Sequence, residues 1–243
     1  MKASPVRIGT SGWSYDHWQD VFYPAKLGKA HWLEYYARQL HSVEINNSFY
    51  HLPDEATLQQ WYEAVPNDFS FSVKASRYIT HMKKLKDAED SVAQFIERIS
   101  LLRHKLGPVL FQLPPRWRFN RERLAKFLGC LDTNFRYAFE FRDHSWLNPE
   151  TCRLLAEHNA AFCIYELDGF LSPREVTADF VYLRLHGPGE AYQGNYQRRV
   201  LSGWAQAMSD WHARGQAVYC YFDNDQAGYA VRNALSLQAM LDH

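Results

Sequence analysis

The order of apolar and polar positions along the chain predicts eight short strands. Each run is rich in β-branched and aromatic residues and is bounded by turn residues, as buried strands are. We expect strands at residues 7–10, 42–46, 69–75, 108–113, 137–142, 161–167, 180–186 and 217–223.

Segments with a helical period separate these strands. We expect helices at residues 30–40, 55–65, 91–106, 121–131, 149–159, 201–213 and 229–241. In the longest one, apolar residues from Val92 to Leu106 recur at helical spacing, and the Gly107-Pro108 pair predicts its end. The connection after the sixth strand is poorly helical.

Strands that alternate with helices predict parallel pairing through right-handed crossovers. An open doubly wound sheet is expected to carry a glycine-rich phosphate turn after its first strand, but that turn reads TSGWSYDHW. Eight βα units in about 250 residues match a (β/α)8 TIM barrel. We therefore expect a single TIM-barrel domain over residues 1–243.

Alternation within each strand assigns side chains to the helix layer or to the barrel interior. Val43 and Ile45 should face the helices, which leaves Glu44 and Asn46 inside. The same rule directs polar side chains of five further strands inward: Ser70, Ser72, Lys74, Gln112, Glu140, Arg142, Arg184, His186, Tyr219, Tyr221 and Asp223.

Three acids and three cations thereby share one axis, and an unpaired buried charge is very costly. Either the six groups form a self-contained network, or they serve a ligand site at the C-terminal mouth. Buried ion pairs stabilise a fold weakly, so the ligand site is the more economical interpretation. Aromatic residues follow the strands and form candidate stacking surfaces, although each one taken singly fits loop packing: Trp13, Tyr15, Trp18, Phe49, Tyr50, Trp117, Trp146 and Tyr192.

Composition narrows the functional classes. The formal net charge is zero and 47% of residues are hydrophobic, which argues against a protein that coats duplex nucleic acid or an anionic membrane. Four cysteines without CxxC spacing suggest reduced thiols. With no signal-like or membrane-spanning stretch, we expect a soluble cytoplasmic protein.

Three kinds of chemistry suit the inward-facing groups. A divalent metal at His186 is disfavoured by the neighbouring cations. Lys74 could form a Schiff base if burial lowers its pKa, although pairing with Glu44 or Glu140 is the simpler role. Binding of an anion by Lys74, Arg142, Arg184 and His186 is favoured, and no cofactor is expected.

Seven blocks of the chain resemble, in order, the signature blocks of the YecE-like family, known as domain of unknown function family 72. They are IGTSGWSYDHW, VEINNSFYHLP, FSVKASRYITH, GPVLFQLPP, FEFRDHSW, YLRLHG and YFDNDQAGYAVRNA. The resemblance implies a TIM-type barrel and no assigned activity. The matching signature residues are Gly12, Trp13, Glu44, Asn46, Phe49, Tyr50, Lys74, Gln112, Glu140, Arg142, Trp146, Arg184, His186, Gly187, Asn224 and Asp225. Asp223 departs from the family, where Asn is more usual.

We therefore expect a pocket for a small anionic or phosphorylated ligand and hydrolase or lyase chemistry. Glu44, Lys74 and Glu140 are the candidate catalytic residues. The expected ligand-binding residues are Trp13, Tyr15, Asn46, Phe49, Tyr50, Gln112, Arg142, Trp146, Arg184, His186, Asp223, Asn224 and Asp225. One alternative is an endonuclease-like barrel that engages single strands through Arg116, Trp117 and Arg118; another is a non-catalytic binding module.

Overall fold

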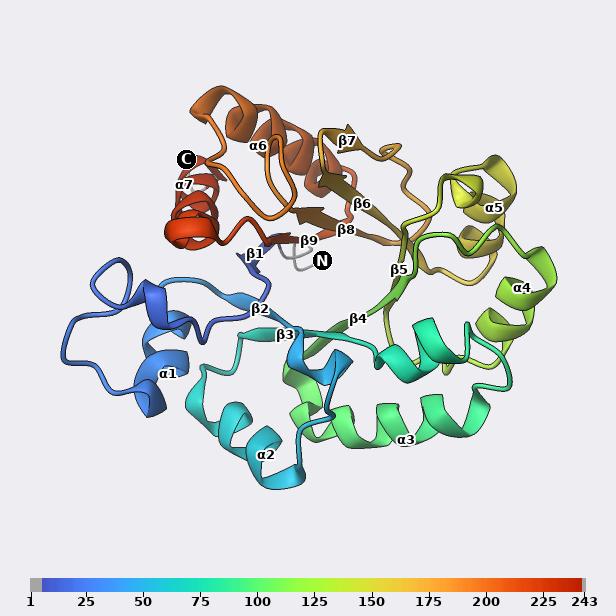
Figure 1. The fold of residues 1–243 in the computed structure, drawn as a ribbon, viewed down its shortest axis with the longest axis horizontal. Helices are drawn as coiled ribbons and strands as arrows, with labels where there is room; N and C mark the ends of the chain where they lie inside the picture. Colours follow the sequence, from blue (N-terminus) through green and yellow to red (C-terminus); the bar gives the residue numbers. More distant parts are fainter. Residues whose placement is uncertain (1–5, 242–243) are drawn as a thin grey trace.

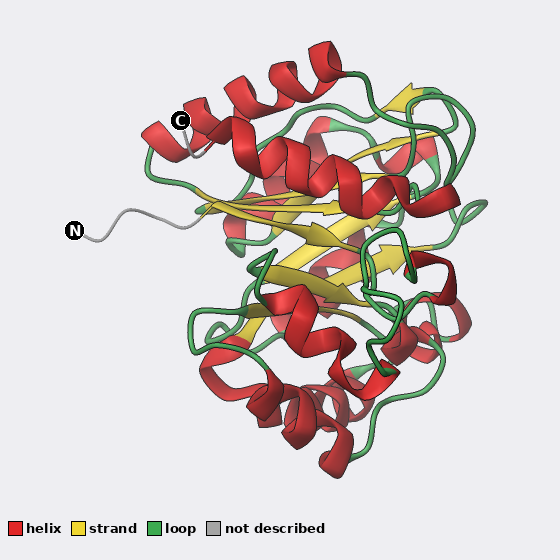
Figure 2. Ribbon diagram, turned by 90° about the vertical axis from the view of Figure 1, so that its left-hand side faces the viewer, coloured by secondary structure: helices red, strands yellow, loops and turns green. Residues whose placement is uncertain are grey.

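Eight parallel strands surround a common axis, and helices cover their outer side (Figures 1 and 2). The computed structural model of the protein describes residues 6–241. The barrel strands are β1 (Val6–Thr10), β2 (Ser42–Ile45), β3 (Ser70–Lys74), β4 (Leu106–Leu113), β5 (Tyr137–Phe141), β6 (Ala161–Leu167), β8 (Phe180–Leu185) and β9 (Ala217–Phe222). The predicted (β/α)8 barrel is confirmed, with every strand within two residues of its expected bounds.

The strands follow the order β1-β9-β8-β6-β5-β4-β3-β2. The short strand β7 (Phe170–Leu171) pairs antiparallel with β6, so a hairpin replaces a helix in that unit. This hairpin was not predicted, although the sequence did indicate that the connection after the sixth strand was poorly helical.

Within the described residues, seven α-helices complete the other units. They are α1 (Trp32–Ala37), α2 (Glu55–Ala64), α3 (Glu89–Ile99), α4 (Arg121–Gly129), α5 (Pro149–Glu157), α6 (Arg198–Ala213) and α7 (Tyr229–Leu241). The Asp54, Asn120 and Asn148 side chains cap α2, α4 and α5, each accepting a bond from the backbone N–H three residues later. None of the helices within residues 6–241 combines the length and apolar character needed to cross a bilayer.

The predicted end of the third helix is wrong. α3 ends at Ile99, a 3₁₀ segment follows over Ser100–Lys105, and Arg103 leaves helical geometry at φ 50°. Gly107 and Pro108 lie inside β4 and do not stop a helix. The Lys105 ammonium donates to the backbone carbonyls of Tyr62 (2.6 Å), in the last turn of α2, and of Val65 (2.7 Å), the residue after it. These tertiary contacts override the apolar helical stripe.

A tyrosine closes the seam of the barrel. β1 and β2 are joined by an isolated bridge between Ser11 and Glu44 at the end of the seam. Closer to the start of β2, the hydroxyl of Tyr36 from α1 accepts from the Thr10 N–H (2.9 Å) and donates to the Ser42 carbonyl (3.0 Å). One side chain thus takes the place of a backbone ladder bond between the two strands.

The strand alternation sorts the interior as predicted. Val43, Ile45, Phe71 and Val73 belong to the apolar cluster between strands and helices. A second, separate cluster fills the lower part of the barrel interior: Leu110, Ala138, Ala161, Cys163, Tyr165, Phe180, Tyr182, Ala217, Tyr219 and Tyr221. Charged side chains lie above this apolar plug.

Candidate functional site

Glu44 is the acidic anchor on the β2 side of the barrel. Its side chain is fully buried, and Oε1 accepts from the Ser11 hydroxyl (2.7 Å) and from Arg184 Nη2 (2.7 Å). Oε2 accepts from the Tyr182 hydroxyl at 2.6 Å. The prediction that Glu44 points into the barrel is confirmed, and both of its oxygens are occupied.

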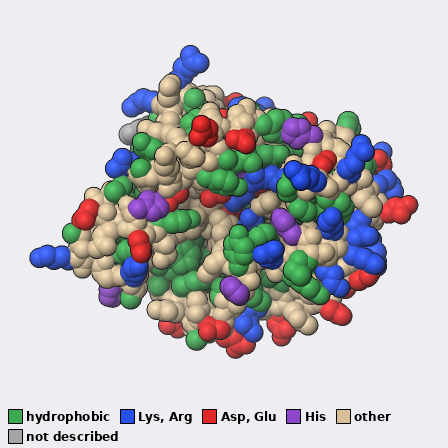
Figure 3. Space-filling model, viewed as in Figure 1, with side chains coloured by type: hydrophobic (Ala, Val, Ile, Leu, Met, Phe, Trp, Pro, Cys, Tyr) green, Lys and Arg blue, Asp and Glu red, His purple; other side chains and the backbone are tan. Residues whose placement is uncertain are grey.

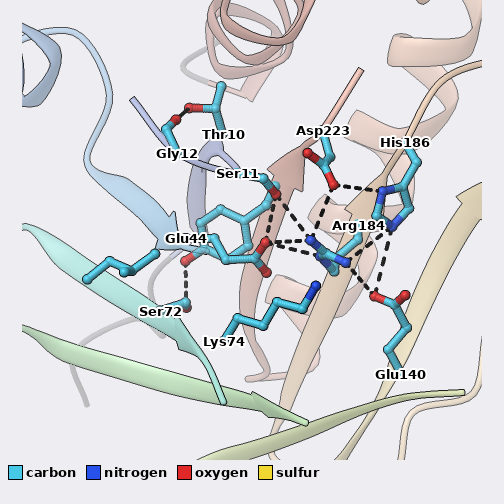
Figure 4. A network of polar contacts seen from close by, with 12 residues as sticks. Thr10, Ser11, Gly12, Glu44, Ser72, Lys74, Glu140, Arg184, His186 and Asp223 are labelled. Carbon is cyan, nitrogen blue, oxygen red and sulfur yellow. Dashed lines mark hydrogen bonds and ion pairs between the residues drawn. The ribbon is translucent and has the colours of Figure 1, made fainter. Parts of the chain in front are cut away.

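Arg184 lies between two carboxylates (Figure 4). From β8 it reaches Glu44 on one side and, through Nη1, Glu140 Oε2 at 2.7 Å on the other. Arg142 pairs with the other oxygen of Glu140 through Nε. Only 1% of the Arg184 side chain is exposed, against 10% for Arg142, so of the two guanidinium groups Arg142 is the one that reaches solvent.

His186 holds the upper part of the network. Its Nδ1 lies 3.0 Å from Asp223 Oδ2, and its Nε2 lies 3.2 Å from Arg142 Nη2. A guanidinium only donates, so Nε2 accepts and the proton sits on Nδ1, where it is donated to Asp223. This arrangement orients both Arg142 and Asp223.

The network fixes the charge of its acids. Burial raises the pKa of Glu140, but the Arg142 and Arg184 guanidinium groups outweigh it and hold that pKa well below its usual value. For Asp223 burial is again opposed, here by His186 and Arg184, and the pKa is lowered. Both carboxylates are therefore ionised at neutral pH.

Lys74 is the exception in this network. It ends β3 with its amine directed toward Arg184 and Glu140 (Figure 4), yet within residues 6–241 the amine has no hydrogen bond and no ion pair. The Lys74 Nζ lies over the Phe49 ring, 4.4 Å from the ring centre. Burial, followed by the Arg184 guanidinium, lowers the pKa of Lys74 to about 8. The expected pairing of Lys74 with Glu44 or Glu140 is wrong, because Arg184 and Arg142 already occupy these carboxylates.

Aromatic and histidine side chains form a lip above Lys74. Phe49 is nearly buried, and its ring meets Tyr50 and His81 edge-on, each at 5.0 Å. Tyr50 is 64% exposed. Burial and the Lys74 charge lower the pKa of His81 to about 4, so that ring is neutral at pH 7.

A cavity of about 520 Å³ opens beside the mouth, between the first two βα loops and helices α1 and α2. The predicted residues Trp13, Tyr15 and Asn46 line it, together with Trp61 of α2. The Trp13 and Trp61 rings meet edge-on at 4.9 Å, and Asn46 Oδ1 is buried with no hydrogen-bond partner in the described chain. Figure 3 views the barrel end at which the strands terminate, with acidic and basic side chains close together near its centre.

The predicted ring contact at Trp146 is wrong, and Trp117 packs beside that ring. Trp146 is fully buried in the helix–strand core, stacked on Phe141 at 5.1 Å, and cannot touch a ligand in the mouth. Trp117 packs edge-on against Trp146, and its carbonyl accepts from the Trp146 indole at 2.5 Å. Both rings were stacking candidates because they follow strands, but core packing places Trp146, whereas Trp117 is half-buried against it.

The last predicted residues support loops or lie beside the network. Asn224 is buried and donates to the Gly194 carbonyl (2.8 Å) and to Asn233 (2.9 Å). Asp225 accepts from the Trp18 indole at 2.7 Å, and burial raises the pKa of Asp225 to about 6. Gln112 is half-buried next to Glu140 in the strand register.

Two contributors to the site were missed. Ser11 and Tyr182 supply the hydroxyl donors to Glu44. Strand alternation does direct Tyr182 inward, two residues before Arg184, but its aromatic ring resembled a core residue. Within residues 6–241 no group of three or more His, Cys, Asp or Glu side chains is arranged to hold a metal ion, and both ring nitrogens of His186 already have partners.

Comparisons with known proteins place this geometry in a family. The model of the family described as "Protein of unknown function DUF72" matches residues 7–243. The chain is 25% identical to the UPF0759 protein YunF of Bacillus subtilis over 98% of this chain and 95% of that protein. It is 34% identical to the UPF0759 protein YecE of Escherichia coli over 56% of this chain and 48% of that protein.

Solved structures agree with the fold. A DUF72 family protein from Thermotoga maritima superposes with a TM-score of 0.88 and 29% identity, covering 98% of this chain and all of that one. A DUF72 family protein from Enterococcus faecalis gives a TM-score of 0.83 at 21% identity, covering 98% of this chain and 96% of that one.

Proposed function

The chain belongs to the DUF72 family, and we propose that its barrel mouth binds a small anionic ligand and acts on it as a hydrolase or lyase. The observation that carries this proposal is the unpartnered Lys74 amine, directed into a network in which every other charged group is paired. Carboxylate or phosphate oxygens of a ligand would supply the acceptors that the amine lacks.

Two cations remain for direct contact with the ligand. Lys74 has no protein acceptor, and Arg142 is the more exposed of the two arginines. We assign Arg184 and His186 a positioning role, because Arg184 is closed in by three carboxylates and His186 orients Arg142. Bidentate contact by Arg142 together with the Lys74 charge suits a planar carboxylate or a phosphate.

The acid–base work falls to Lys74 in this proposal. A general acid or base works best with a pKa near the operating pH. The pKa of Glu140 lies far below that range, whereas the pKa of Lys74 is about 8. Glu44 and Glu140 instead hold Arg184 and Arg142 in place, and their charges offset those of the cations.

Calorimetric titration with inorganic phosphate tests the binding step. Lys74→Met should weaken phosphate affinity at least about tenfold, as expected when a charged contact is lost. The matched control is Lys126→Met on α4, whose amine pairs at the surface with Asp87 and Glu89 and should leave affinity unchanged. Equal phosphate binding by both variants would refute the proposal, as would no phosphate binding by the parent protein.

A second candidate is single-strand nucleic-acid binding on the same face. Arg116, Arg118, Lys84 and Lys86 form no ion pair with the described residues, and basic side chains gather near α4 in Figure 3. Trp117, the expected stacking ring, is half-buried and packs edge-on against Trp146. Oligonucleotide binding that weakens with salt and is lost in an Arg116→Ala, Arg118→Ala variant would support this candidate. Phosphate binding without turnover of any tested compound would favour a non-catalytic binding module.

A further inference from the structure

We propose that the Lys74 amine is a nucleophile that forms an imine with the carbonyl group of a small anionic ligand, such as a 2-oxo acid or a phosphorylated aldehyde. This inference rests on the proposed function and names its substrate class. It starts from a comparison between the half-buried Lys74 and the buried Lys105.

Lys105 shows how a buried structural lysine is satisfied here. It is 3% exposed, and its amine donates to the backbone carbonyls of Tyr62 and Val65 at 2.6 and 2.7 Å. Its amine also lies over the Tyr62 ring, at 4.3 Å. Burial lowers the pKa of Lys105 as well, but its amine is committed to two carbonyl acceptors and is closed off from solvent.

Lys74 has the opposite environment. Its backbone is fixed, because its carbonyl accepts from the Ser48 hydroxyl at 2.7 Å and the next residue, Ala75, donates to Leu110 at 2.8 Å. Phe49 covers one side of the amine, 4.4 Å from the ring centre, and no acceptor of the described chain reaches it. The result is an anchored side chain with an uncommitted nitrogen at the mouth.

Electrostatics makes this nitrogen reactive at neutral pH. Burial and the Arg184 charge lower the pKa of Lys74 to about 8, so about a tenth of the molecules carry the neutral amine at pH 7, against less than about one in a thousand for an ordinary lysine. The ion pairs of Arg184 with Glu44 and Glu140 hold that guanidinium beside the amine.

The reaction balances without any co-reactant. The nitrogen lone pair attacks the carbonyl carbon, a C–N bond forms, and the π electrons move to oxygen. The oxygen then leaves as water with the two hydrogens of the amine, and an imine remains. On protonation from solvent, the resulting cation lies beside the Glu140 and Asp223 carboxylates, in the place the lysine charge had.

Such an iminium accepts electrons. When a C–H or C–C bond on the carbon next to the former carbonyl carbon breaks, its electron pair forms the C=C bond of an enamine and the C=N π electrons move to nitrogen. The other fragment leaves as a proton taken up by solvent, or as a carbonyl compound whose hydroxyl proton passes to solvent. Arg142, at the edge of the network, is placed to hold the carboxylate or phosphate of the same ligand. Within the proposed hydrolase or lyase classes, this chemistry selects the lyase.

The test is reductive trapping with pyruvate and cyanoborohydride on the full chain, read by intact mass and by peptide mapping. Lys74 should be modified at least about tenfold faster than the surface lysine Lys126 at pH 7, and its rate should rise through pH 8. Lys126→Met should be labelled like the parent at Lys74. The inference would be overturned if pyruvate labelled the surface lysines as fast as Lys74 and if Lys74→Met were labelled to the same extent as the parent.

Lys74→Arg separates imine formation from charge. Arginine keeps a cation at the mouth but forms no such imine, so this variant should still bind inorganic phosphate within about tenfold of the parent while losing the adduct. Phosphate binding by the parent without trapping at Lys74 would overturn the imine and leave the proposed function standing. Trapping at Lys74 without phosphate binding would support the nucleophile and contradict the anion site. Circular dichroism of each variant confirms that the loss is not a folding defect.

Discussion

The lower and upper halves of the barrel interior are built from the same strands but differ in chemistry. Along β8 and beyond, inward-facing positions change from Phe180 and Tyr182 in the apolar plug to Arg184 and His186 in the ionic layer. Apolar residues would stabilise the upper half at least as well, because buried ion pairs gain little against their desolvation. The residues of the lower half are therefore explained by stability, whereas stability alone does not explain the charged residues of the upper half.

The largest expected effect comes from making the upper half apolar at its centre. Arg184→Met removes the cation shared by Glu44 and Glu140 and leaves two buried carboxylates short of a partner. We expect a loss of about 3–5 kcal/mol in the free energy of unfolding by urea. Adding Glu44→Gln should recover part of it, and a loss under about 1 kcal/mol would mean that the ionic layer is much more hydrated than its burial indicates.

A smaller effect should mark the boundary between the halves. Tyr182 belongs to the apolar plug, but its hydroxyl donates to Glu44. Tyr182→Phe should cost about 1.5–3 kcal/mol in urea unfolding, since a buried carboxylate loses a donor. The matched change Tyr219→Phe, in the same cluster, loses only a bond from Arg136 at 3.1 Å and should cost about 0.5–1 kcal/mol. If the two substitutions lowered the free energy of unfolding equally, Tyr182 would not mark the boundary between the apolar plug and the ionic layer.

The smallest loss of stability is expected at Lys74. Lys74→Met breaks no ion pair and removes the desolvation cost that lowers the pKa of this lysine, so urea unfolding at pH 7 should show no loss of stability. The folded-state pKa, about 8, lies below the unfolded value near 10.4, so the unfolded chain binds more protons between these values. Parent stability should therefore gain a rising contribution between pH 8 and about 10.4. The difference between parent and Lys74→Met should shift in favour of the parent over that range, and a flat difference would contradict the lowered pKa.

The sequence carried enough information for the barrel and for the direction of its side chains. Val43, Phe71, Leu113 and Val181 face the helices as predicted, because a two-residue period between two apolar layers leaves one consistent assignment. The same rule correctly predicted that the side chains of Glu44, Glu140, Arg184 and His186 point toward the barrel axis.

Contacts that depend on competition between neighbours were beyond this rule. Lys74 should have paired with a glutamate, but Arg184 and Arg142 reach both glutamates first. Trp146 follows its strand as a mouth residue would, yet stacking on Phe141 draws it into the core. Side-chain reach and packing decide such cases, and neither is encoded in periodicity.

The Tyr36 seam has a consequence for how the chain reaches its fold. β1 has its whole ladder with β9, at the other end of the sequence, and it meets its chain neighbour β2 through a bridge and a tyrosine hydroxyl. The first strand thus gains its backbone partners only after the last strand is in place, which raises contact order and slows closure. A circular permutant that starts just before β2 and carries β1 directly after α7 would turn this long-range pairing into a local one, and it should close its barrel faster than the natural order does.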